Sequence, residues 1–239
     1  MTSDRELILG KLKAVDAERR RRADEPELGR KVLALKAFQQ ARFTRTYADL
    51  LASERYGPAC RFFLEELYGP KDYAPRDAQF VKIVSGLVQF FPAGVVETVS
   101  SVAELHALSE ELDSAMAAQL REDRIAASDY VRAWQAVGRP ADRRRQITLT
   151  VGVARTLDRV TNPMMRNAVR AMRLPARAAG LMDLQRFVEK GFDAFVAMHG
   201  AKEFIATVQS REEAFAAAVV AADPADASAS TAGALAALA

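Results

Sequence analysis

The sequence between residues 95 and 116 has an apolar side chain at every third or fourth position. This spacing places the side chains on one side of an α-helix and predicts a long amphipathic helix from residue 93 to about residue 123. The stripe consists of Val95, Val99, Val102, Leu105, Leu108, Leu112 and Met116. A stripe of this length is typical of a helix that buries one face in a core of other helices.

Most of the remaining chain has the same periodicity. Helices are expected at residues 5–22, 28–52, 58–68, 78–91, 128–137, 141–160, 163–173, 176–198 and 201–221. Residues 145–154, "RQITLTVGVA", alternate apolar and polar side chains and are the one stretch that favours a strand, but their flanks are helical and no partner strand is visible. The expected fold class is therefore all-α, a multi-helix bundle of about eight to nine helices.

Length and composition suggest how the chain is organised. A chain of 239 residues, half of them hydrophobic, forms one large domain or two small ones. We expect a single α-helical domain over residues 1–222, in which residues 1–25 are a candidate N-terminal helical arm. Residues 223–239, "DPADASASTAGALAALA", have small side chains and little charge, so we expect a disordered Ala-rich tail.

The sequence is typical of a cytoplasmic protein. Its single cysteine, Cys60, excludes an internal disulfide framework and suits a reducing compartment. The N-terminus lacks the apolar run of a signal peptide. The most apolar stretch, residues 80–91, carries Lys82 and Gln89 and is shorter than the ~20 residues that span a membrane.

The segment "ERYGPACRFFLEELYGPKDYAPRD", residues 54–77, contains Tyr-Gly-Pro twice. Pro58 suits the opening position of a helix, where its missing N–H would have no partner in any case. Gly69 suits the residue just past a helix end, where φ is often positive, and Pro70 blocks continuation. The repeat therefore predicts a helix over residues 58–68, and Asp77 is expected to cap the next one.

Glu66 is the residue of this segment with a candidate chemical role. None of its helical neighbours three or four positions away can pair a charge: Phe62, Phe63, Gly69 and Pro70. If the phenylalanines are core residues, the carboxylate must find a donor elsewhere or its pKa rises. Three interpretations stay open: a structural link to an arginine of another helix, a functional carboxylate in a pocket, and exposure to solvent.

The string "RFFLEELYGPKD" resembles the signature of the bacterial FFLEELY-motif proteins, and the match to that signature is literal. The resemblance can be followed residue by residue over positions 56–77. It implies an α-helical cytoplasmic protein from a bacterial group without an assigned activity. It supplies no catalytic residue that could be transferred to this chain.

The sequence carries no recognisable signal for metal or cofactor chemistry. A di-iron bundle uses two Glu-x-x-His pairs, and neither His106 nor His199 has a glutamate three residues before it. His106 shares a helix face with Glu110, which indicates a polar contact, and His199 suits a helix C-terminus. Phosphate-binding Gly-rich motifs and Gly-x-Ser-x-Gly are missing, and Cys60 is expected to be buried. We expect no metal, no cofactor and no catalytic residue.

Positive charge is concentrated in one region. Residues 139–177 contain ten arginines, no lysine and two acids, whereas residues 93–123 contain seven acids and one arginine. Arg166, Arg170 and Arg173 follow one another on one helix face, and Arg177 would continue the row beyond the kink or helix end expected at Pro175. These arginines need an anion nearby, and with Glu66 they are the candidate anion-binding residues.

Three sources of that anion stay open. It can be internal, from Glu66, the acidic helix or a second copy of the chain in a homodimer. It can be a phosphate-bearing ligand or phosphorylated partner, because guanidinium groups suit phosphate. Nucleic acid is disfavoured, since the basic stretch has no aromatic residue for stacking.

Two functions follow from these observations. The first is a non-enzymatic α-helical interaction or ligand-binding protein. The second is an enzyme or sensor that binds a phosphorylated or acidic small molecule through the arginine row, with Glu66 as its acid–base group. Contacts of the arginine row distinguish them: ion pairs over a flat contact favour the first, and a concave pocket with Glu66 in reach favours the second.

Overall fold

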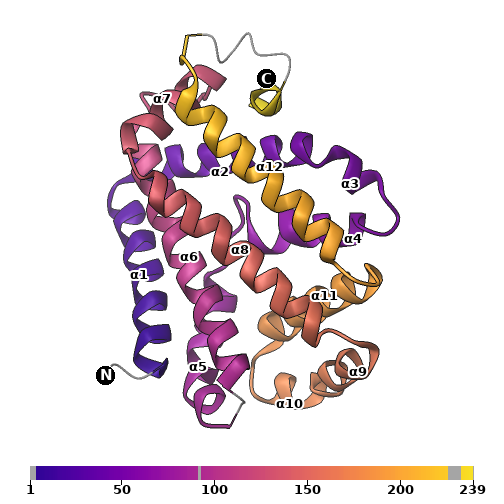
Figure 1. The fold of residues 1–239 in the computed structure, drawn as a ribbon. Coiled ribbons are helices and arrows are strands. Elements are labelled where there is room, and N and C mark those ends of the chain that lie inside the picture. The colour runs from indigo at the N-terminus through magenta and orange to yellow at the C-terminus, as the bar shows by residue number, and fades with distance from the viewer. Residues whose placement is uncertain (1–3, 91–92, 226–232, 239) are drawn as a thin grey trace.

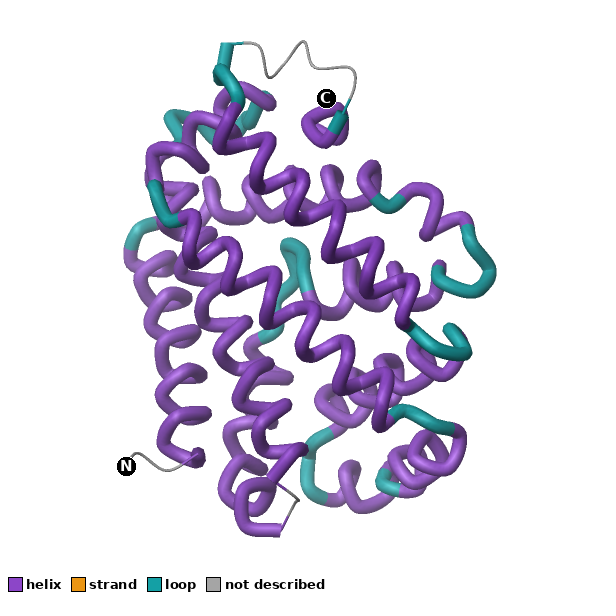
Figure 2. The backbone as a smooth tube through the Cα atoms, viewed as in Figure 1, coloured by secondary structure: helices purple, strands orange, loops and turns teal. Residues whose placement is uncertain are grey.

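The computed structural model describes residues 4–90, 93–225 and 233–238, and within these ranges every regular element is a helix (Figure 1, Figure 2). The α-helices are α1 (Asp4–Asp24), α2 (Pro26–Thr46), α3 (Ala48–Ala52), α4 (Gly57–Phe62), α5 (Ala74–Phe90), α6 (Ala93–Gln119), α7 (Ala127–Val137), α8 (Pro140–Val160), α9 (Pro163–Ala171), α10 (Arg173–Ala178), α11 (Met182–Ala197) and α12 (Lys202–Ala221). The all-α class is confirmed, and residues 145–154 lie inside α8. Among the described helices, none has the length and apolar character needed to cross a membrane.

Helix α6 is the centre of the bundle, with α1, α2, α7 and α8 packed against it (Figure 1). Of the expected stripe, Leu112 and Met116 are fully buried, whereas the residues before them are half-buried. Because neighbours cover α6 on several sides, it also buries a polar face that carries Glu110, Asp113 and Ser114. The periodicity located the helix correctly but not all of its buried residues.

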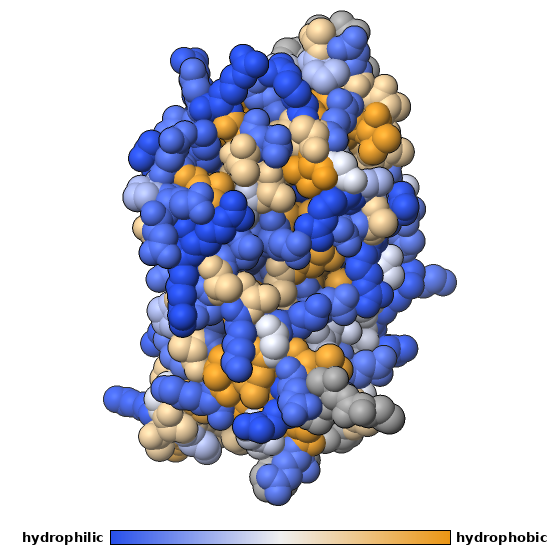
Figure 3. All heavy atoms as spheres, turned by 90° about the vertical axis from the view of Figure 1, so that its left-hand side faces the viewer, coloured by the Kyte–Doolittle hydropathy of each residue, from blue (hydrophilic) through white to orange (hydrophobic). Residues whose placement is uncertain are grey.

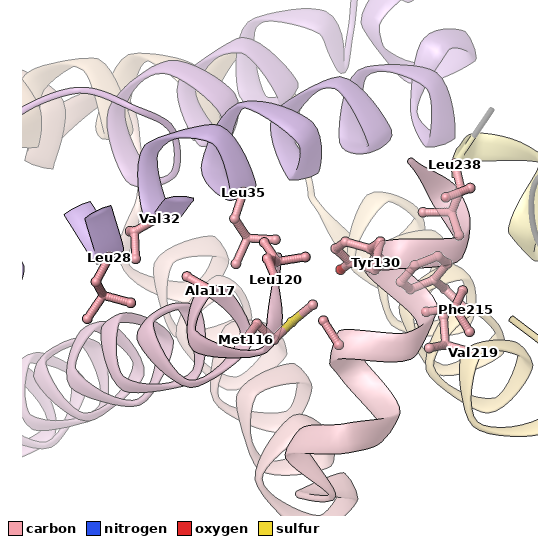
Figure 4. Packing of buried hydrophobic residues seen from close by; sticks show 13 residues of the cluster. Leu28, Val32, Leu35, Met116, Ala117, Leu120, Tyr130, Phe215, Val219 and Leu238 are labelled. Carbon is pink, nitrogen blue, oxygen red and sulfur yellow. The ribbon is translucent and has the colours of Figure 1, made fainter. Parts of the chain in front are cut away.

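Three hydrophobic clusters hold the helices together. The first joins α2, α6, α7 and α12 around Leu35, Met116, Tyr130 and Phe215 (Figure 4). A second cluster packs residues of α3, α4 and α8 against α11 and α12. The third places α1 against α5 and α6, so the N-terminal helix shares a core with them. Figure 3 shows the side of the molecule on the left of Figure 1, where hydrophilic side chains predominate and apolar patches are small.

The Tyr-Gly-Pro segment is less regular than expected. Helix α4 begins at Gly57, and from Phe63 to Leu67 (η1) the backbone widens into a π-helix, a rare geometry that is frequent at functional sites. Tyr68 is extended, which ends the helical run one residue before the predicted end. Gly69 has a φ of 154°, and a Cβ atom there would lie 2.9 Å from Nε2 of Gln40. The positive φ therefore favours glycine here, whereas Gln40 is a flexible side chain that could move away from a Cβ atom.

Two other expectations need correction. Asp77 does not cap α5; it lies one turn inside that helix and pairs with Arg19 of α1 at 2.5 Å. The predicted helix over residues 28–52 is divided at Tyr47, whose hydroxyl donates to Glu212 of α12 at 2.6 Å. The same carboxylate pairs with buried Arg42 at 2.7 Å. A contact across the bundle therefore accompanies the break.

Part of the expected disordered tail is ordered. Residues 226–232 and 239 lie outside the described residues, but Ala234–Leu238 forms a short 3₁₀ helix (η3) against α2 and α12. The Leu238 side chain is 3% exposed and belongs to the first hydrophobic cluster (Figure 4). Leu235 and Leu238 are the two large apolar side chains of this turn, and both pack against that cluster.

Candidate functional site

The predicted arginine row lies on α9 and α10 and contacts α11. Arg170 donates from Nη2 to both carboxylate oxygens of Asp193 at 2.9 Å. Nε of Arg166 lies 3.5 Å from the same carboxylate. Two arginines therefore share one acid of the neighbouring helix, and their charges are partly neutralised inside the chain.

Arg173 makes the strongest contact of the row. Its Nε and Nη2 atoms donate to the two oxygens of Glu189 at 2.7 and 2.6 Å, a bidentate arrangement. The hydrogen bond from Arg173 lowers the pKa of Glu189. Gln185 of α11 donates to Glu189 of the same helix at 2.8 Å. It also donates to the carbonyl of Val169 at 2.6 Å and so connects α11 with α9. Glu189 is therefore ionised and held in place by three donors.

The remaining two candidates lie apart from this contact. Arg177 is exposed on α10 and has no ion pair within the described residues. Glu66 binds Nζ of Lys190 at 2.6 Å, and Arg76 donates to its backbone carbonyl rather than to its carboxylate. The sequence indicated Glu66 and the acids of α6 as internal partners of the arginine row. In the structure the partners are instead Asp193 and Glu189 of α11. The Glu66 carboxylate pairs with a lysine of α11 instead of an arginine.

These ion pairs orient α9 in an unusual way. Its charged side turns toward α11, and its apolar side turns toward solvent. Met164 is 74% exposed and Leu174, at the start of α10, is 77% exposed. We call the following residues the outer apolar face: Met164, Met165, Ala168, Ala171, Met172 and Leu174, all of which are exposed. An amphipathic helix normally buries its apolar stripe, so this orientation leaves an apolar surface uncovered.

The segment that carries the outer apolar face is rich in arginine, and acids lie only at its two ends, Asp158 and Asp183, and on the adjacent α11. From Arg159 to Met182 the chain has five arginines and no acid or lysine. Three of these arginines are paired with α11, while Arg159 and Arg177 have no ion pair within the described part of the chain. The surroundings of the face are consequently positive.

A second group of charges is buried around α6, away from this surface. Glu110 accepts from Nζ of Lys36 at 2.5 Å and from Nη1 of Arg22, and its backbone carbonyl accepts from Arg22 at 2.6 Å. Nε2 of His106 lies 3.6 Å from the same carboxylate. Burial acts to raise the pKa of Glu110, but the contact with His106, followed by Lys36 and Arg22, lowers it overall. The carboxylate stays ionised and joins α1, α2 and α6.

Asp113, one turn further along α6, has its pKa shifted in the opposite direction. It is 1% exposed and accepts from the Tyr68 hydroxyl at 3.2 Å and from Nε2 of Gln39 at 3.2 Å. Burial raises its pKa, and the nearby Glu110 charge adds to the rise, while Lys36 opposes it. Tyr68, the last residue of FFLEELY, therefore places its hydroxyl group in this polar core.

The buried carboxylates can hold a fold together more readily than they can perform a reaction. Two carboxyl groups with oppositely shifted pKa values are a pattern of acid–base sites, but both are enclosed by their own chain partners. No group of three or more candidate ligands that could hold a metal occurs among the described residues. The sequence indicated the contact of His106 with Glu110. It did not predict that Asp113 joins them in a buried cluster, although two acids three positions apart within the apolar part of α6 were a signal for it.

The thiol of Cys60 is expected to react slowly with iodoacetamide at pH 8. Burial raises its pKa to about 11, so only about one thiol in a thousand is ionised at that pH. Mass spectrometry of the alkylated protein should show a rate on the order of 100-fold below that of the chain unfolded in urea. Equal rates in the two conditions would contradict the burial of this side chain.

A family model, described as a domain of unknown function (DUF8198), matches residues 18–226. No curated protein and no solved structure matches the chain. The matched range contains α2 through α12 in full and therefore includes both the outer apolar face and the buried charges of α6.

Proposed function

The chain belongs to the family described as a domain of unknown function (DUF8198), and we propose that it is a non-enzymatic interaction protein. It binds an acidic amphipathic helix of another protein on the outer apolar face. The observation that carries the proposal is the orientation of α9, whose arginines contact α11 while its methionines contact solvent.

The ion pairs to α11 explain how an apolar surface can be kept in water. Arg166 and Arg170 fix the rotation of α9 through Asp193, and Arg173 fixes the start of α10 through Glu189. The helix cannot turn its methionines inward without breaking these contacts. The outer apolar face is therefore a preformed surface, and covering it with a partner removes apolar area from water at about 25 cal/mol per Å².

The chemistry of the face favours a protein helix as its occupant. Methionine side chains are flexible and polarisable, and they occur at surfaces that accept helices of varied shape. The positive surroundings, with Arg159 and Arg177 unpaired within the described residues, favour acidic groups at the edges of the partner. We therefore specify the partner as a helix with one leucine-rich side and glutamates or aspartates beside it.

A membrane surface fits these observations less well. Helices that lie on bilayers carry Trp, Phe or Leu on the apolar face and direct Lys or Arg toward lipid headgroups. Residues 159–182 contain no aromatic residue and no lysine, and Arg166 and Arg170 are directed at α11. Binding to anionic vesicles is accordingly an outcome of the test that would count against a protein partner.

The alternative function, an enzyme or sensor for an anionic small molecule, has less support. Such a ligand would have to displace Asp193 and Glu189 from Arg166, Arg170 and Arg173, and the Glu66 carboxylate already binds Lys190. Within the proposal, these arginines position the outer apolar face and Glu66 ties η1 to α11. The literal motif match supports kinship with the FFLEELY-motif proteins and a cytoplasmic location, both of which remain part of the proposal.

Fluorescence anisotropy with two designed peptides tests the proposal. The first is an 18-residue helix with leucines on one side and glutamates on the other, and the second has lysines in place of the glutamates. We expect the acidic peptide to bind with a Kd of about 10–100 µM, typical of a small exposed surface, and the basic peptide to bind at least tenfold more weakly. The variant M164S/L174S should lose at least tenfold in affinity for the acidic peptide.

A matched control separates this site from general surface hydrophobicity. Leu33 and Val220 are also exposed, on α2 and α12, and L33S/V220S removes the same kind of apolar surface elsewhere. This variant should bind the acidic peptide like the unchanged protein. Equal binding by all three proteins, no binding at all, or binding only to anionic vesicles would overturn the proposed function.

A further inference from the structure

A groove between α2 and α12 already holds a short piece of the chain. In this groove η3 packs against both helices, and Leu238 enters the first hydrophobic cluster beside Phe215 and Val219 (Figure 4). Leu235, three positions earlier, packs against the same cluster. The anchors are thus two leucines on one side of a single helical turn.

Few contacts fasten this turn. Nε of Arg45 donates to the carbonyl of Ala237 at 2.7 Å. Among the described residues, this is the one hydrogen bond that a side chain of the groove makes with η3. The remaining contacts with the first hydrophobic cluster are apolar and come from Ala234, Leu235 and Leu238. One isolated turn has little stability of its own, and one hydrogen bond and two leucines hold this one. Its dissociation from the groove should therefore require little free energy.

The groove between α2 and α12 also contains space that η3 does not fill. A cavity of about 470 Å³ lies beside η3, lined by Arg45, Thr46, Arg211 and Phe215 as well as by the turn itself. Oγ1 of Thr46 is buried with no hydrogen-bond partner within the described residues. The groove therefore offers space and a hydroxyl group beyond what η3 uses, whereas Arg45 already bonds to Ala237 and Arg211 pairs with Asp49.

We propose that this groove is a peptide-binding site for a helical turn with leucines at positions i and i+3, and that the chain's own C-terminal turn is its built-in, exchangeable occupant. The ligand is the C-terminal segment of a second copy of this chain, which has the same leucines and the same small residues. The site lies on α2 and α12 and does not depend on the outer apolar face, so each proposal can fail without the other.

The test uses a fluorescent peptide with the sequence of residues 228–239 and the full-length variant L235S/L238S, whose own turn can no longer compete. We expect the peptide to bind this variant with a Kd of about 50 µM. The unchanged protein should bind at least tenfold more weakly, because a tethered occupant competes at an effective concentration of about 1 mM. A peptide with both leucines replaced by serine is the control and should not bind.

A second measurement keeps the test valid if the variant is unstable. In the unchanged protein, a saturating excess of the peptide should increase hydrogen exchange at the Ala236 amide, which bonds to the Gly233 carbonyl at 3.2 Å. The serine peptide should leave that exchange rate as it was. Equal peptide affinity for the variant and the unchanged protein, or no change in the exchange of η3, would overturn the inference.

Discussion

Replacing Glu110 with alanine is expected to destabilise the fold by about 3–5 kcal/mol, because removing one partner of a buried ion pair leaves the other charges uncompensated. Lys36 and Arg22 would both lose their carboxylate in a place where water cannot replace it. Urea unfolding, followed by circular dichroism, measures the change in the free energy of unfolding. The matched control is Glu111→Ala, the next residue, whose half-exposed side chain pairs with Arg139 and should cost under about 1 kcal/mol.

The pH dependence of the same variant provides an independent check. The pKa of Glu110 is lower in the folded chain than its ordinary value of 4.5, so this group contributes stability at pH values above 4.5. That contribution is lost as the pH falls below 4.5 toward the folded-state pKa. The free-energy difference between the unchanged protein and Glu110→Ala should therefore shrink steadily on acidification. A difference that is constant from pH 7 to pH 3 would show that folding does not lower the pKa of Glu110.

Replacing Phe62 with alanine is expected to cost about 3–5 kcal/mol, the usual loss for a buried aromatic side chain. Phe62 is the first residue of FFLEELY; it packs on Phe63 and Phe187, and its ring lies against Gly191 of α11. The loss should appear in urea unfolding as a lower midpoint with an unchanged slope. Leu33→Ala, at an exposed position of α2, is the control and should change stability by less than about 0.5 kcal/mol.

Gly191 allows a stricter test of this packing. A Cβ atom at that position would lie 3.0 Å from Cζ of Phe62, so Gly191→Ala should destabilise the unchanged protein by about 1–3 kcal/mol. In the Phe62→Ala background the clash is gone, and the same substitution should stabilise α11 by up to about 1 kcal/mol through helix propensity. The two single substitutions are therefore coupled with a defined sign. Additive effects would mean that the two residues do not touch.

Much of the fold was predictable from the sequence because helices are specified locally. The periodicity of α6, the glycine at residue 138 and the proline at the start of α8 determine elements and ends through interactions within a few residues. Predictions failed where a distant residue decided the outcome. Tyr47 interrupts the helix that its neighbours favour and binds Glu212, 165 positions later.

The candidate sites show the same division. The arginine row and its need for an anion could be read from the sequence, but the identity of that anion could not, because Asp193 and Glu189 become neighbours only when α11 packs on α9. An amphipathic pattern in α9 indicates that one side is apolar, and it does not say which side faces the core. Rotation of a helix depends on all the contacts it makes, and here the side of α9 that forms ion pairs faces α11 while three methionines stay exposed.

The amino-acid sequence alone determined that this chain is helical, where most of its helices lie and that positive charge gathers in residues 139–177, since each of these properties depends on residues close together in the chain. Only the tertiary structure decided that α9 exposes its apolar side, that Glu110 and Asp113 lie in a buried polar core and that Leu238 returns to the bundle. Each of those outcomes is a balance between burial and pairing among segments far apart in sequence. That balance is settled only when the helices pack.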